Sequence, residues 1–398
     1  MNKMSKIRFK GFNTSLERKQ IGDITTSFSG GTPKSSNKSY YEGNIPFIRS
    51  GEVKSKQTEL FISDEALQNS SAKMVEKGDV LYALYGATSG EVAISQINGA
   101  INQAILAIKP NSGYSSEFIM NYLKKEKDNI LEKYLQGGQG NLSAAIVKSI
   151  ELSLPSQEEQ SAIGTLFRTL DDLLVSYKDN LANYQSLKAT MLSKMFPKAG
   201  QTVPEIRLDG FEGEWEVVNL GTLINNYDEI ISGESGFPIA TSSRKGLYLQ
   251  NDYFEGGRTG IDLTLDFHRV PMGYVTYRHM SDDSIFKFNK NNFETDVLVS
   301  KEYPVFMSND SSDIDFLLYH LNNSRLFLRF STMQKLGGTR VRLYYKNLIT
   351  YKLAVPTIKE QQAIGGYFSN LDNLINSHQE KISQLETLKK KLLQDMFI

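Results

Sequence analysis

The chain has 398 residues, which is long enough for two or three domains that each bury a core of their own. It has no cysteine and no apolar run long enough for a signal peptide or a membrane-spanning helix, which excludes disulfide scaffolds and thiol chemistry and predicts a cytoplasmic protein with no membrane segment. Lys and Arg total 45 and Asp and Glu also total 45, so any attraction to nucleic acid must come from local clusters of charge.

The first globular region, residues 1–151, is predicted to combine short strands with one helix. Glycine-bearing turns separate strand candidates at Ile45–Arg49, Val80–Leu84, Val92–Ile94 and Ala104–Ile108. A helix near Ser116–Tyr134 and a glycine-rich loop at 137–141 follow. Polar and basic residues beside such turns can match base edges, which makes them candidate DNA contacts. In this region they are Lys34, Arg49, Tyr85, Thr88, Ser89, Gln139 and Asn141.

Catalytic motifs are scarce in this region and elsewhere. The segment GGTPKSS only superficially resembles a phosphate-binding loop, and no motif for S-adenosylmethionine binding or adenine methylation is found. The four histidines have no metal-ligand spacing, so we expect neither a metal site nor a cofactor in this chain. Glu52 and Lys54 fit the E-x-K pattern of metal-dependent nucleases, with Asp23 as an upstream acid. Such a short match arises readily by chance when 23% of the residues are charged.

Residues 152–200 are predicted to form a long helix and a linker. Apolar residues spaced alternately by three and four positions predict one seam of a coiled coil. The seam consists of Phe167, Leu170, Leu174, Tyr177, Leu181 and Tyr184, and it continues through Lys188 to Met195. Ser156 and Glu159 predict a capping box at the start of the helix.

The second half of the chain repeats the plan of the first. Residues 152–196 align without a gap on residues 353–397, with 17 of the 45 positions identical, and RFKGF at 8–12 is echoed by RLDGF at 207–211. We therefore predict a second globular region at 201–352 and a second long helix at 353–398. The second seam consists of Phe368, Leu371, Ile375, Ile382, Leu385 and Leu392. Two such seams in one chain are best buried against each other as an antiparallel pair.

The second globular region has strand candidates at Leu247–Gln250, Tyr274–Tyr277 and Val297–Lys301 and a helix candidate at Ser312–Phe330. From Phe316 to Lys359 the chain has no acidic residue but eight Lys and Arg, which is a charge signal for nucleic acid. The candidate DNA contacts here are Arg244, Lys245, Arg258, Arg278, His279, Arg340 and Arg342. The predicted fold class is thus α+β, with two tandem globular domains joined by two long antiparallel coiled-coil helices in a pseudo-twofold arrangement.

These features together resemble the DNA specificity subunits of type I restriction-modification enzymes. The resemblance rests on the helix openings LPSQEEQSAIG and VPTIKEQQAIG and on GDITTSFSGGTPKS, IPFIRSGEV and GDVLYALYGATSGEVAI; the second half departs from it with VTYRHMSDDS. It implies that each globular domain reads one half of a bipartite site in double-stranded DNA. It also implies that the helices set the gap between the half-sites, and that two modification subunits with S-adenosylmethionine and two restriction subunits with ATP and Mg bind the chain, which is itself non-catalytic.

Two alternatives come from other classes. The first is a self-contained restriction or modification enzyme that uses Glu52 and Lys54, and the missing cofactor motifs argue against it. The second is a coiled-coil scaffold that binds no DNA, and the acid-free basic stretch argues against it.

Overall fold

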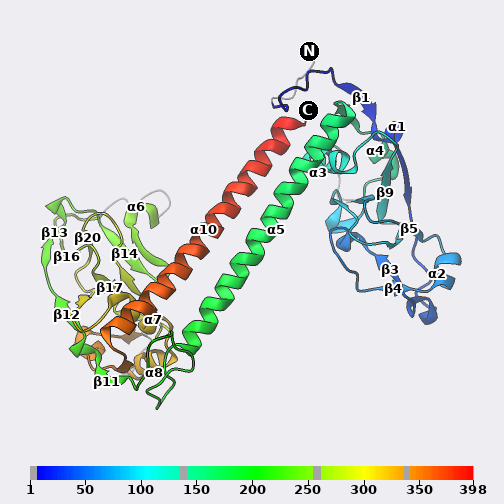
Figure 1. The fold of residues 1–398 in the computed structure, drawn as a ribbon. Coiled ribbons are helices and arrows are strands. Elements are labelled where there is room, and N and C mark those ends of the chain that lie inside the picture. Colours follow the sequence, from blue (N-terminus) through cyan, green and yellow to red (C-terminus); the bar gives the residue numbers. More distant parts are fainter. Residues whose placement is uncertain (1–6, 135–140, 254–260, 336–339, 398) are drawn as a thin grey trace. The chain divides into compact units, whose positions relative to one another are not determined.

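The computed structural model describes residues 7–134, 141–253, 261–335 and 340–397. Two of the candidate contacts, Gln139 and Arg258, lie outside these residues. The chain divides into two compact units: unit 1 consists of residues 1–179 and 380–398, and unit 2 of residues 180–379. The two long helices, α5 (Gln157–Lys194, green in Figure 1) and α10 (Ile358–Met396, orange to red), each contribute residues to both units. In the described part of the chain, no helix has the length and apolar character needed to cross a membrane.

Unit 1 contains two four-stranded sheets and a covering helix. The first sheet has the order β2 (Thr25–Ser29), β9 (Ile105–Pro110), β6 (Val80–Ala83) and β7 (Val92–Ile94). The second has the order β4 (Phe61–Ile62), β3 (Ile45–Ile48), β8 (Gly99–Ile101) and β5 (Lys73–Val75). The helix is α3 (Ser116–Tyr134). Three short helices complete the unit: α1 (Ile21–Ile24), α2 (Asp64–Gln68) and α4 (Ala144–Lys148).

The first sheet is buried on both faces. Successive residues of its central strand β6 point to opposite faces of the sheet, and all of them are apolar. Val80 and Tyr82 face a core that includes Phe118 and Leu123 of α3. Leu81 packs on the other face, in a core shared with the second sheet. The unit therefore has a helix layer and two sheet layers. A separate antiparallel pair, β1 (Glu17–Gln20) with β10 (Glu151–Leu154), leads into α5.

Unit 2 repeats this plan with different residues. One sheet has the order β12 (Ile224–Tyr227), β21 (Val305–Ser308), β17 (Val275–Tyr277) and β19 (Phe288–Lys290). The other has the order β13 (Ile230–Ser232), β16 (Asp266–Val270) and β20 (Val297–Ser300). Short pairs are β11 (Glu216–Asn219) with β23 (Lys352–Val355), β14 (Ala240–Ser243) with β15 (Gly246–Leu249), and β18 (Met280–Ser281) with β22 (Val341–Arg342). The helices are α6 (Gln250–Tyr253), α7 (Ile314–Asn323), α8 (Arg325–Met333) and α9 (Tyr345–Leu348).

The single helix expected at 312–330 is wrong, because the chain breaks at Ser324 into α7 and α8. Ser324 has extended backbone angles and its hydroxyl accepts hydrogen bonds from the amides of Leu326 (3.1 Å) and Phe327 (3.3 Å). It therefore caps a new helix.

Antiparallel packing of α5 and α10 is visible inside each unit. In unit 1, Lys389 pairs with Asp171 and Lys178 with Glu386, so α10 numbers fall as α5 numbers rise. Leu170, Leu174 and Leu385 are buried there together, with the seam residues Tyr177, Ile382 and Leu392 packed on them. In unit 2, Lys188 pairs with Asp372. Phe167 and Phe368 also belong to the cores of units 1 and 2, respectively.

The predicted capping box is only half correct. The Ser156 hydroxyl accepts a hydrogen bond from the Glu159 amide (3.3 Å), but the Glu159 carboxylate does not return to the cap. It binds Arg8 instead, with Nε 2.9 Å from Oε1. In unit 2, Glu360 binds Arg207 in the same way, at 2.8 Å and 2.6 Å. Both carboxylates are 1% exposed, and a buried charge needs a charged partner more than the exposed helix end needs a second cap.

Candidate nucleic-acid interface

The β14–β15 hairpin presents two basic residues, Arg244 and Lys245, at its exposed tip. The turn is closed by the Ser243 hydroxyl, which donates to the Gly246 carbonyl (3.1 Å) and accepts from the Lys245 amide (3.1 Å). Gly246 has φ of 143°, a conformation that residues with a Cβ rarely adopt. The sequence at this turn thus fixes the position of both side chains.

Asn289 of β19 holds the hairpin against the sheet. This buried residue donates from its Nδ2 to the Ser242 hydroxyl (2.8 Å) and to the Ser243 carbonyl (2.9 Å). These two hydrogen bonds attach the hairpin to β19.

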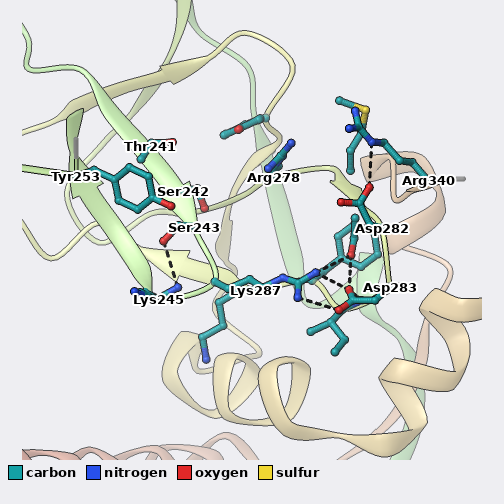
Figure 2. A pocket seen from close by; sticks show the side chains of 16 residues that line it. Thr241, Ser242, Ser243, Lys245, Tyr253, Arg278, Asp282, Asp283, Lys287 and Arg340 are labelled. Atoms are coloured by element: carbon teal, nitrogen blue, oxygen red, sulfur yellow. Dashed lines mark hydrogen bonds and ion pairs between the residues drawn. The ribbon is translucent and has the colours of Figure 1, made fainter. Parts of the chain in front are cut away.

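A groove of about 760 Å³ runs beside the hairpin, and we call it the arginine groove. It is lined by the hairpin, by the segment from Arg278 to Lys287, by Tyr253 and Tyr303, and by Arg340. The fold thereby gathers four of the predicted contacts, Arg244, Lys245, Arg278 and Arg340. With Lys287 there are five basic residues in the groove against two acidic ones, Asp282 and Asp283 (Figure 2).

The two acidic residues hold two of the arginines. Asp283 binds both terminal nitrogens of Arg244, at 2.8 Å and 2.5 Å. Burial alone would raise the pKa of Asp283, but the hydrogen bonds from Arg244 and Ser281 bring it below its usual value. Asp282 accepts from Nε of Arg340 at 2.9 Å (Figure 2), so this hydrogen bond does not use the terminal nitrogens of Arg340. A guanidinium held by Nε can still offer two donors to a guanine edge.

Two of the remaining basic candidates are exposed and make no ion pair within the described residues. Arg278 follows β17 and lines the groove, and Arg342 lies on β22 opposite Met280.

His279 is placed differently from its prediction. It is only 5% exposed and stacks on Tyr344, with the ring centroids 5.7 Å apart. Burial, the largest effect, lowers the pKa of His279, which favours the neutral form of the ring. His279 thus packs inside the fold, and its DNA contact stays a prediction.

In unit 1, the predicted contacts Tyr85, Thr88, Ser89 and Asn141 lie around one loop. Tyr85 and Asn141 are exposed and pair in an isolated β-bridge, and Lys34 is exposed in a loop after β2. The Thr88 hydroxyl donates to the Tyr85 carbonyl (3.3 Å). Ser89 is 6% exposed and donates to the Leu84 carbonyl (3.1 Å), so it supports this loop from inside.

Arg49 is occupied by acidic neighbours, which also bears on the nuclease alternative. It donates to Glu52 (2.9 Å) and Glu59 (2.6 Å). Burial alone would raise the pKa of Glu52, but hydrogen bonds led by that from Arg49 lower it to about 2. Lys54 pairs with Glu91 instead. Glu52 and Lys54 thus each have another partner, and among the described residues no cluster of His, Asp or Glu could hold a metal ion.

Three charged residues of the groove, Lys287, Asp282 and Asp283, were not among the residues predicted from the sequence. Lys287 directly precedes β19, and the loop between β18 and β19 brings it to the groove. Asp282 and Asp283 carried a signal, since a pair of acids directly follows the basic segment YRHMS.

A family model described as "Type I restriction modification DNA specificity domain" matches residues 13–183 and 243–387. The type I restriction enzyme MjaVIII specificity subunit of Methanocaldococcus jannaschii is 21% identical over 398 residues, which covers 94% of this chain and 90% of that protein. The MjaIX specificity subunit of the same organism is 27% identical over 247 residues, covering 58% of this chain and 55% of that protein. The crystal structure of a type I restriction-modification S subunit from M. genitalium has a similar fold, with a TM-score of 0.61 at 14% identity, and the match covers 100% of this chain and 99% of that one.

Proposed function

The chain belongs to the type I restriction-modification DNA specificity family and is a DNA-recognition subunit, and from this premise we propose that units 1 and 2 each read one half of a bipartite site. The arginine groove carries the proposal for unit 2. Its lining has more basic than acidic side chains, and its exposed arginines have terminal nitrogens that suit guanine edges. In unit 1 the surface around Tyr85 and Asn141 takes the equivalent role, with an amide that suits adenine.

We propose that catalysis resides in partner subunits. Two modification subunits, with S-adenosylmethionine, would methylate adenine, and two restriction subunits, with ATP and Mg, would cleave. The long helices would bind the modification subunits and set the gap between the half-sites. A net charge of zero supports dependence on partners, because affinity for DNA grows with the number of phosphates neutralised.

The test is methylome sequencing of a methylation-free host that expresses this chain with a cognate modification subunit. We expect a bipartite methyladenine motif only when both proteins are present. Arg278→Ala with Arg340→Ala should relax one half of that motif and leave the other unchanged, since each bidentate base contact contributes about 1–3 kcal/mol of discrimination. Equal loss in both halves would contradict the assignment of one half-site to each unit. Methylation by this chain alone would point to a catalytic site of its own.

A further inference from the structure

A second groove, of about 650 Å³, lies beside the same hairpin in unit 2. It is lined by the hairpin residues from Lys245 to Tyr248, by β19, by α7 and by parts of α5 and α10. Its basic residues are Lys188, Lys245, Lys287 and Lys290, and we call it the lysine groove. Lys245 and Lys287 also line the arginine groove, so the two grooves are adjacent.

The lysine groove has more positive than negative charge. Asp315 pairs with Lys290 (2.5 Å), and Asp372 pairs with Lys188 while also accepting from the Tyr319 hydroxyl (2.7 Å). Both acidic residues of the groove are therefore engaged. Lys245 and Lys287 make no ion pair within the described ranges.

Lys287 lines the groove in a partly buried position and makes no ion pair within the described residues. Burial, followed by the nearby charge of Lys188, lowers the pKa of Lys287, and the charge of Asp372 offsets this only in part. A partly buried lysine without an ion pair, in a groove with an excess of lysines, favours an anionic ligand.

The chemistry of the lining distinguishes the two grooves. No arginine among the described residues lines the lysine groove, and most of its other polar residues are amides: Asn289, Asn292, Asn322, Asn323, Asn373 and Asn376. Three of these amides already donate to the protein itself, Asn289 to the hairpin, Asn322 to the Phe288 carbonyl and Asn323 to the Tyr319 carbonyl. Lysine is a compact charge suited to phosphate oxygens, and the side chains of Asn292, Asn373 and Asn376 can donate to phosphate or sugar. Arginine, in the neighbouring groove, suits the edges of bases.

In unit 1, the globular region also places a lysine beside an ion pair between α5 and α10, and we call this place the junction of the unit. Lys389 and Asp171 there are the repeat equivalents of Lys188 and Asp372 with helix roles exchanged. Lys124 of α3 lies beside that pair, and burial together with the charge of Lys389 lowers its pKa. The globular regions hardly match in sequence, so a partly buried lysine at both junctions is unexpected from the repeat alone.

We propose that the lysine groove binds backbone phosphates of the DNA whose bases face the arginine groove, with Lys245 and Lys287 each contacting a phosphate. Lys245 and Lys287 line both grooves, so in this arrangement they bind phosphates at the boundary between the base-reading arginine groove and the lysine groove. The inference rests on the proposed function, because it takes the arginine groove to be the base-reading surface.

The experiment measures the affinity of the full chain in complex with its modification subunit for two fluorescent duplexes at a series of salt concentrations. One duplex carries the methylated motif and the other has the half-site of unit 2 scrambled. We expect Lys245→Ala and Lys287→Met each to weaken both duplexes by the same factor and to reduce the slope of log affinity against log salt by about 0.9. Lys301→Ala, which removes an exposed lysine that pairs with Asp266 outside both grooves, is the matched control and should leave the slope unchanged.

The outcomes separate the two proposals. If the wild type prefers the cognate duplex, two results would overturn the phosphate site. One is an unchanged salt slope in both lysine variants, and the other is a loss of affinity for the cognate duplex alone. A wild type without that preference would overturn the proposed reading by unit 2, and a reduced slope in the lysine variants would still support phosphate binding. Lys245 is exposed at a turn, so its variant keeps the test valid even if Lys287→Met misfolds.

Discussion

Replacing Arg207 by alanine should destabilise unit 2 far more than an ordinary surface change. Arg207 makes two hydrogen bonds to Glu360, at 2.8 Å and 2.6 Å, and also donates to the carbonyls of Gly213 (2.5 Å) and Glu212 (2.9 Å). Glu360 is 1% exposed, so the variant leaves a carboxylate buried without its partner. Breaking a buried pair on one side costs about 3–5 kcal/mol. For a unit of this size that corresponds to a fall in melting temperature of roughly 6–20 °C.

The assay is calorimetry of the full chain, with hydrogen exchange to locate the loss at β11 and β23. The double variant Arg207→Met with Glu360→Gln should regain most of the stability, since no charge then remains buried. Lys301→Ala is the control, because its pair with Asp266 is about half exposed and contributes at most about 1 kcal/mol. If Arg207→Ala costs no more than this control, the buried carboxylate does not depend on the arginine as argued. Arg8→Ala should have the same effect at β1 and β10 in unit 1.

Four further predictions follow from individual contacts. Tyr184 of α5 and His378 of α10 lie side by side, with ring centroids 5.1 Å apart. Insertion of one heptad after each of them should lengthen the gap in the methylated motif by about three base pairs, because seven helical residues span about 10.5 Å. An unchanged gap would refute the spacer role. Gly365→Ala should cost about 1–3 kcal/mol by thermal melting, because its Cβ would lie 2.6 Å from Oδ1 of Asp313, the N-cap of α7, whereas Gly366→Ala meets open space and should not. Burial lowers the pKa of His320 from 6.5 to about 4, so between these pH values the unfolded chain binds a proton that the folded chain does not. The free energy of unfolding should therefore fall by about 3 kcal/mol as the pH drops from 6.5 to 4. His320→Gln should flatten the dependence of the unfolding free energy on pH in this range, and an unchanged dependence would exclude His320 as the cause. Glu52→Gln should leave cleavage by the complete enzyme intact, since Glu52 binds Arg49, and loss of cleavage in a folded variant would revive the nuclease alternative.

Periodicity predicted the long helices well because a repeated seam is a local signal. The alternation of three and four positions gave α5 and α10, and the repeat indicated that they pack as a pair. The family, the fold class and the DNA-recognition role were confirmed. The break at Ser324 was missed because apolar residues continue through it, and only the cap geometry reveals it.

Long-range partners were harder to predict. Glu159 was assigned to a local cap, but its partner Arg8 lies 151 positions away in sequence. A signal did exist, since both members recur in the second half of the chain, Arg8 as Arg207 (199 positions later) and Glu159 as Glu360 (201 positions later). Candidate contacts were chosen by residue type, and type alone does not tell an exposed Arg278 from a buried His279. Their role in DNA contact stays a prediction.

The aromatic end of α10 has a consequence for synthesis on the ribosome. Phe397 packs in the core of unit 1, with its ring centroid 5.0 Å from that of Phe118 and 5.7 Å from that of Phe167. Unit 2 is one continuous stretch of chain, whereas unit 1 needs residues 380–397 to close its core. At about 5–20 residues per second, the roughly 200 residues in between take about 10–40 s to make. The domain that leaves the ribosome first is therefore completed last, and during that interval its open core is a surface for chaperones.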